Sequence, residues 1–130
     1  MRQTFRKDER LCKKILIANL FNQGKSFTVY PFRITWLITE LPSDYPAQLL
    51  ISVPKSSVRK AFARNTIKRR MRESYRKNKY ILYEYLSEKQ VKIALSITYT
   101  QKEILPYHLL QEKIIVLLQR LREDHAKSAG

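Results

Sequence analysis

A run of positive charge between residues 55 and 79 constrains this chain more than any other feature of its sequence. These 25 residues contain eleven lysines and arginines and a single acid, Glu73, so they contribute +10 to the chain's net charge of +15. The run contains no proline or glycine, which predicts one long helix, capped by Ser56 or Ser57 and ending near Lys77.

This basic helix has two sides. Ile67 and Met71 lie on one side at helical spacing and predict contact with a core. Arg64, Lys68 and Arg72 follow one another at four-residue steps on another side, where like charges repel unless an anion neutralises them. Arginine suits bidentate contact with phosphate and lysine supplies a point charge. The pattern therefore favours a nucleic-acid contact over an ordinary solvated helix face.

Length and composition favour one domain. The chain has 130 residues, 44% of them apolar, which suffices for one core but not for two. We expect a single domain over residues 1–130, with its core between about residues 9 and 121 and both termini flexible. Cys12 is the only cysteine, which excludes an intramolecular disulfide and predicts a reducing compartment. No apolar run approaches 18 residues, so we expect a cytoplasmic protein with no membrane partner.

Apolar spacing predicts a helix near the N-terminus. It should run from about Glu9 to Asn22, with Asp8 as its N-cap and Gly24 just beyond its end. Leu16, Ile17 and Leu20 broaden its apolar side, so we expect this helix to pack against a sheet.

Alternating residues predict the strands. Residues 27–40 are rich in aromatic and β-branched side chains, with a break at Pro31, and residues 47–53 form a second period-2 run. The prolines between these two runs favour a turn, so a hairpin is the simple interpretation. Residues 90–100 show the clearest alternation in the chain and predict another strand.

The C-terminal part should be helical. Residues 80–86 are apolar and ambiguous, and they could add a helical turn or two. Pro106 suits the first turn of a closing helix, whose apolar face reaches Leu121 before a polar tail at residues 123–130. The order α-β-β-β-α-β-α predicts an α+β fold, a two-layer sandwich in which three helices pack on a central, mostly antiparallel four-stranded sheet.

The segment from Arg64 to Glu73, RNTIKRRMRE, closely resembles the signature of the ribonuclease P protein family. The family pattern is Arg-Asn-Arg, an apolar residue, Lys-Arg and a further Arg one turn later. A Ser-Lys-Lys-like turn at a strand end precedes it, and residues 52–55 occupy that place here. Residues 21–27, FNQGKSF, resemble the family's Phe-x-x-Gly-x-Ser segment. The resemblance covers about residues 9–121.

The resemblance implies two binding surfaces. The basic helix would bind a catalytic RNA, and a cleft would bind the 5′ leader of precursor tRNA. The RNA-binding residues would be Lys55, Arg59, Lys60, Arg64, Asn65, Lys68, Arg69 and Arg72. The leader-cleft residues would be Ile17, Phe21, Phe32, Ile34 and Trp36. Aromatic residues in a sheet are more often core, so Trp36 is equally expected to be buried.

The family also implies how the reaction is divided. The RNA performs the chemistry, with magnesium held mainly by RNA phosphates, and the protein alone has no catalytic residue. The residues agree, because no carboxylate cluster has metal-binding spacing and His108 and His125 are isolated. The family fold resembles ribosomal protein S5 domain 2, with a left-handed βαβ crossover. Nothing in the sequence demands a dimer, so we expect a monomer.

This chain departs from the family pattern at two positions. Thr66 stands where the family usually has a third arginine, and Arg70, on another side of the helix, could partly replace it. Ile17 stands where similar proteins present an aromatic residue to the cleft.

Three other functions are weaker. A ribosomal or other structural RNA-binding protein without a processing role would share the charge and size, but not the specific motif. A self-sufficient nuclease would need a general acid and base that the two histidines do not supply. A helix-turn-helix protein fits least, because the basic helix follows a strand.

Overall fold

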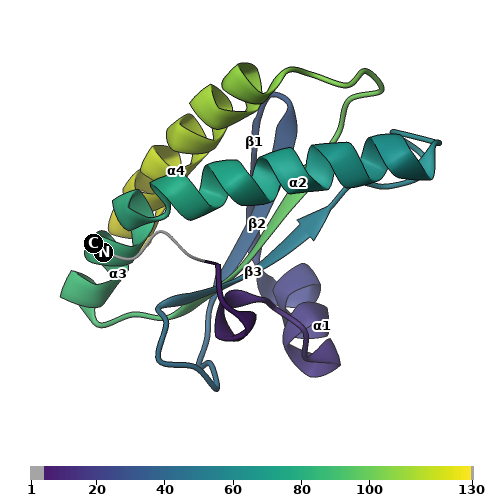
Figure 1. Ribbon diagram of the computed structural model, residues 1–130. Helices are drawn as coiled ribbons and strands as arrows, with labels where there is room; N and C mark the ends of the chain where they lie inside the picture. Colours follow the sequence, from purple (N-terminus) through teal and green to yellow (C-terminus); the bar gives the residue numbers. More distant parts are fainter. Residues whose placement is uncertain (1–4, 130) are drawn as a thin grey trace.

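The computed structural model describes residues 5–129 as an α+β fold with a four-stranded sheet (Figure 1). In chain order the elements are η1 (Lys7–Glu9), α1 (Lys14–Gln23), β1 (Lys25–Val29), β2 (Phe32–Ile38), β3 (Ala47–Ser52), α2 (Ala61–Asn78), α3 (Tyr80–Lys89), β4 (Ile93–Tyr99) and α4 (Tyr107–Ala129). The predicted α+β class and the four strands are confirmed.

The strands lie in the order β1-β2-β4-β3. The pairs β1–β2 and β2–β4 are antiparallel, whereas β3 and β4 are parallel. The predicted hairpin between residues 27–40 and 47–53 is therefore wrong, because β4 lies between β2 and β3. Strand β4 lies between β2 and β3, and almost all of it is buried, with large residues such as Leu95 on one face and small ones such as Ala94 on the other.

Helices cover both faces of the sheet. Helices α2, α3 and α4 form the main core with one face, around Ile34, Leu95 and Ile97. Helix α1 packs on the other face, where its buried Leu20 joins Ala94 in a second, smaller cluster. The prediction that α1 packs against a sheet is confirmed, but the sheet is sandwiched between helices and not covered on one face only.

There are four α-helices in the described range, one more than predicted, because residues 80–89 form a helix of their own. Leu82 and Leu86 on α3 are fully buried and hold it against the core. Lys79 lies between the two helices, as the C-cap residue of α2 and the N-cap residue of α3. The ambiguous apolar stretch is thus a separate helix rather than an extension of α2.

Helix α1 begins later than predicted. Residues 10–13 are extended, and the N–H of Leu11 donates to the carbonyl of Leu49 at 2.9 Å, which covers part of the edge strand β3. Asp8 does not cap the helix, which begins at Lys14. Gly24 ends it as predicted, and its packing requires a glycine, since a Cβ there would lie 2.3 Å from the carbonyl oxygen of Leu20.

A buried ion pair ties this N-terminal segment to the helices. Glu9 and Lys79 are 0% and 3% exposed, and Lys79 Nζ lies 2.6 Å from Glu9 Oε2. The hydroxyl of Tyr83 donates to the same oxygen at 2.6 Å, and the backbone N–H of Arg6 donates to Oε1 at 2.9 Å. Both carboxylate oxygens therefore have partners.

Helix α4 continues to Ala129, so the predicted polar tail is wrong. His125, four residues after the buried Leu121, is itself 4% exposed. Its Nδ1 lies 2.7 Å from the hydroxyl of Tyr85, and its ring contacts that of Trp36. This packing extends the helix beyond the apolar stretch that the sequence shows.

Candidate nucleic-acid interface

Helix α2 lies across the sheet next to α4, with one side turned outward (Figure 1). Ala63, Ile67 and Met71 are buried beneath it, because residues spaced three or four apart share one side of a helix. The predicted core-facing side is confirmed. The basic residues on the opposite side face solvent.

The loop before α2 differs from the prediction. The helix begins at Ala61 and not at the serines after Lys55. The chain turns at Pro54, whose carbonyl accepts the N–H groups of Ser57 and Val58, both at 3.0 Å. Val58 is buried and anchors the loop in the core. Three of the predicted RNA-binding residues therefore project from an exposed loop: Lys55, Arg59 and Lys60.

The structure gathers all eight predicted RNA-binding residues on this loop and on α2. Six are exposed and two are half-buried. The exposed ones are Lys55, Arg59, Lys60, Asn65, Arg69 and Arg72, and the half-buried ones are Arg64 and Lys68. Within residues 5–129, none of the seven basic ones forms a salt bridge. Their charge is available to an anion, and we call these eight residues the basic surface.

Arg64 has a second, structural role. Its Nη1 donates to the carbonyls of Val58 at 3.1 Å and Arg59 at 2.6 Å. The guanidinium therefore joins the first turns of α2 to the preceding loop and helps to hold the loop's basic residues in place.

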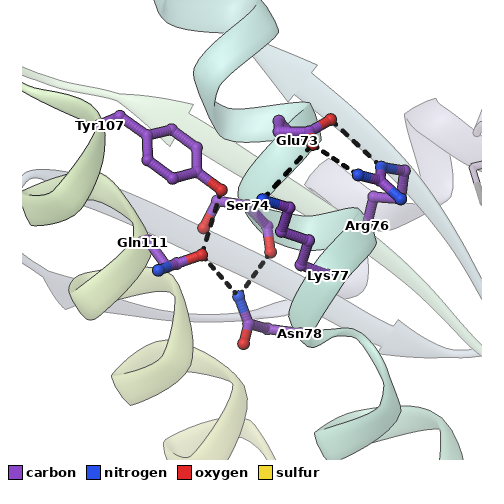
Figure 2. Close-up of polar contacts among 7 residues, drawn as sticks. All are labelled: Glu73, Ser74, Arg76, Lys77, Asn78, Tyr107 and Gln111. Carbon is purple, nitrogen blue, oxygen red and sulfur yellow. Dashed lines mark hydrogen bonds and ion pairs between the residues drawn. The ribbon is translucent and has the colours of Figure 1, made fainter. Parts of the chain in front are cut away.

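The basic surface ends at the last turns of α2. Figure 2 shows Glu73 next to Arg76 and Lys77, with nitrogen–oxygen distances of 2.5 Å and 3.8 Å. The hydrogen bond from Arg76 is the main cause that lowers the pKa of Glu73. Asn78 Nδ2 donates to the carbonyl of Ser74 and to Gln111 of α4. This end of α2 is thus partly neutralised and fastened within the protein.

The side chains of Thr66 and Arg70 both donate to backbone carbonyls of the protein. The Thr66 hydroxyl donates to the carbonyl of Phe62 at 3.0 Å, within its own helix. Arg70 Nη1 donates to the carbonyl of Leu105 at 2.8 Å, in the loop before α4. Arg70 therefore lies on the side of α2 that meets this loop, and its partial replacement of the third arginine stays a prediction.

The prediction that Phe32, Ile34 and Trp36 line a leader cleft is also wrong. Their exposed fractions are 0%, 0% and 2%, and they belong to the main core under α2 and α4. Residues at every second position of a strand share one face, so all three point away from α1. A base could stack on them only if the helices that cover this face moved away from the sheet.

The same strands present a polar row on the face that α1 covers in part. Strand register aligns Thr28 with Arg33, Arg33 with Thr98, and Thr98 with Ser52. We call these four residues the polar sheet face. Thr28 and Arg33 are exposed, and Thr98 and Ser52 are half-buried. The predicted site does not include these four residues, although the alternate positions of the same strands indicate them.

Ile17 and Phe21 of α1 lie on this side of the sheet. Ile17 is half-buried and packs in the smaller cluster with Leu20 and Ala94. Phe21, one turn later, is 54% exposed. Of the five predicted cleft residues, Phe21 alone has a ring available for stacking, and Ile17 packs in the smaller cluster on the same side of the sheet.

The described residues contain no ready metal or acid–base site. Within residues 5–129, no three histidine, cysteine, aspartate or glutamate side chains come together to hold a metal ion. His125 is buried against Tyr85, and burial lowers its pKa. His108 is exposed on α4. No helix in this range is both long enough and apolar enough to span a membrane.

Two comparisons with known sequences agree with each other. The family model described as Ribonuclease P matches residues 5–122. The ribonuclease P protein component of Porphyromonas gingivalis is 31% identical over 123 residues, covering 95% of this chain and 90% of the relative. That of Chlorobium phaeobacteroides is 32% identical over 129 residues, covering 92% and 88%.

Solved structures share the fold. The RNase P protein of Staphylococcus aureus superposes with a TM-score of 0.70 at 20% identity, covering 88% of this chain and 96% of the other. That of Thermotoga maritima gives 0.67 at 24% identity, covering 86% and 96%. Because the family model spans almost the whole chain and two relatives are more than 30% identical over most of their length, the protein belongs to the ribonuclease P protein family.

Proposed function

We propose that this chain is the protein subunit of a bacterial ribonuclease P, which removes the 5′ leader of precursor tRNA to make the mature tRNA 5′ end. The observation that carries the proposal is the basic surface on a chain of this family. The RNA subunit performs the cleavage in this family, so the protein's contribution is binding. A ribosomal or other structural RNA-binding role is the alternative.

The basic surface is the proposed site for the catalytic RNA. Arg69 and Arg72 are exposed and, within residues 5–129, form no salt bridge, so each can donate two parallel hydrogen bonds to a phosphate. Neutralising a phosphate also releases condensed counterions, which makes such binding strongly dependent on salt. Asn65, exposed one turn before Arg69, can donate to or accept from a base or a sugar.

The polar sheet face, together with Phe21, is the proposed site for the leader. A single-stranded leader presents phosphates, 2′-hydroxyls and unpaired bases. Arg33 and the hydroxyls of Thr28 and Thr98 can bond the first two, and the exposed ring of Phe21 can stack on a base. In this proposal the leader contacts Arg33 and the other residues of the polar sheet face, and not Phe32, Ile34 and Trp36, which are buried on the opposite face of the sheet.

Further proposals rest on family membership. Magnesium would be held mainly by RNA phosphates, and the free protein would be a cytoplasmic monomer that folds as one domain. The helices α2 and α3 would connect the parallel strands β3 and β4 by a left-handed crossover, as in ribosomal protein S5 domain 2.

Reconstituted cleavage tests the proposed function. A precursor tRNA with a 5′ leader is incubated at low magnesium with a bacterial ribonuclease P RNA, with the protein, and with both. Cleavage at the mature 5′ end only when both are present is the expected result. Cleavage by the protein alone would reveal catalytic residues, and a protein that binds RNA without stimulating cleavage would favour the structural RNA-binding role.

A further inference from the structure

An aromatic ring stands exposed in the first turn of α2. Phe62 is 66% exposed, although burying a phenylalanine side chain is normally favourable. Within the part of the chain that the structure describes, no aromatic ring packs against it. The ring instead contacts a cation, Lys60 Nζ, which lies 5.9 Å from the ring centroid. The ring is therefore open to a partner.

The surroundings of Phe62 favour an anionic partner. Arg59 and Lys60 are exposed just before it. Asn65 and Arg69 follow at three and seven residues, a spacing that places them on the same side of the helix. The first turn of α2 contains no acid, and Glu73, the acid of this helix, lies eleven residues away and is paired with Arg76. A polyanion with an apolar, flat group complements this surface.

We propose that Phe62 is a stacking platform for one unpaired base of the ribonuclease P RNA. The inference rests on the proposed function and adds a residue outside the motif that resembles the family signature. An unpaired base exposes both of its faces, and the phosphates on either side of it would lie within the field of Arg59, Lys60 and Arg69. The base would take the place of water on the ring, while the cations neutralise the phosphates.

Salt dependence separates stacking from charge. Stacking on an aromatic ring strengthens binding by roughly 5- to 150-fold, which corresponds to ~1–3 kcal/mol per base. Phe62→Ala should weaken binding to the RNA by a factor in this range at every salt concentration, with the slope of log K against log salt unchanged. Lys68→Ala should instead flatten the slope, by up to ~0.7–0.9 per lost phosphate contact.

Two other variants test the geometry of the contact. Phe62→Trp should retain the affinity, and its indole fluorescence should be quenched when RNA is added, measured in a Trp36→Phe background. Phe62→Leu keeps apolar area without a ring and should bind nearly as weakly as the alanine variant. Ile38→Ala is the matched control, because Ile38 is also exposed, at 52%, but lies at the end of β2.

Each failure has its own signature. If the wild-type protein does not bind the RNA, the proposed function fails and the stacking inference falls with it. If the wild type binds and Lys68→Ala flattens the slope, but Phe62→Ala binds as tightly as wild type, the stacking inference alone is overturned. Full affinity in Phe62→Leu, or an equal loss in Ile38→Ala, would also overturn it. Matching urea midpoints of the variants exclude unfolding as the cause of weaker binding.

Discussion

Replacing Glu9 by glutamine removes the negative charge opposite the buried ammonium of Lys79. Glutamine has nearly the same shape and can still accept the N–H of Arg6. The ammonium, however, is only 3% exposed, so water cannot replace the lost carboxylate. Among residues 5–129, the rings of Tyr45 and Tyr83 lie 5.8 Å and 5.2 Å from the ammonium nitrogen, and each attracts it more weakly than a carboxylate does.

The expected loss follows from this burial. Breaking a buried ion pair by removing one partner typically costs ~3–5 kcal/mol. Because Glu9→Gln keeps the backbone hydrogen bond and the two rings stay near the ammonium, we expect a loss of unfolding free energy at the lower end of this range, about 3 kcal/mol. Domains of this kind have a total free energy of unfolding of ~5–15 kcal/mol, so this one substitution should remove a large part of it.

Equilibrium unfolding in urea measures the loss. With a denaturant slope of about 1.5–2 kcal/mol per molar, the midpoint should fall by roughly 1.5–2 M. Glu73→Gln is the matched control, because its ion pair with Arg76 is partly exposed, with 42% and 29% of the two side chains accessible, and pairs that solvent reaches contribute ~0–1 kcal/mol. Adding Lys79→Met to Glu9→Gln should recover stability, since no charge then remains buried. A midpoint that falls no further for Glu9→Gln than for Glu73→Gln would refute the reasoning.

Three other predictions concern RNA binding and pH. Arg64→Ala should both flatten the salt dependence of RNA binding and lower the urea midpoint, because Arg64 also bonds the loop carbonyls; a loss confined to one of these measurements would contradict the double role. Arg33→Ala should weaken binding of precursor tRNA that carries a leader but not of mature tRNA, each measured with the assembled holoenzyme, and equal losses would exclude Arg33 from the leader site. Burial lowers the pKa of His125 below its usual 6.5, so the unfolded chain takes up the proton first and stability should fall as the pH drops below about 6.5. Urea unfolding at pH 7.5 and 5.5 tests this, and His125→Gln should reduce the difference between the two free energies of unfolding.

The sequence predicts the fold class well because its signals are local. The alternation of Ile93, Leu95 and Ile97 defines a strand whatever its neighbours are, and Ile67 and Met71 define the buried side of α2. What the alternation does not contain is the pairing of strands. In the folded chain β4 lies between β2 and β3, and both of its faces are buried. This arrangement cannot be read from the alternation within any one strand.

The errors at the candidate site have the same origin. A strand shows two alternating sets of residues, and the sequence does not state which set lies under the larger core. Phe32, Ile34 and Trp36 have the aromatic and apolar character that stacking needs, but the same character drives them into the core beneath α2 and α4. The polar alternate set, with Arg33 and Thr98, remains for solvent or RNA. The ion pair between Glu9 and Lys79 could not be predicted from the sequence either, since the two residues are 70 positions apart in the chain.

The basic surface and the polar sheet face are joined by very little chain. Ser52, at the end of β3, belongs to the polar sheet face, and Lys55, three residues later, opens the basic surface. The loop from Lys55 to α2 is anchored by the buried side chain of Val58, and Arg64 of α2 donates to the carbonyl of Val58. The connection between the two surfaces is therefore short and fixed in place. A catalytic RNA on one surface and a leader on the other would then keep a nearly constant relative position. The protein could in this way orient the scissile phosphate of precursor tRNA without supplying a catalytic group of its own.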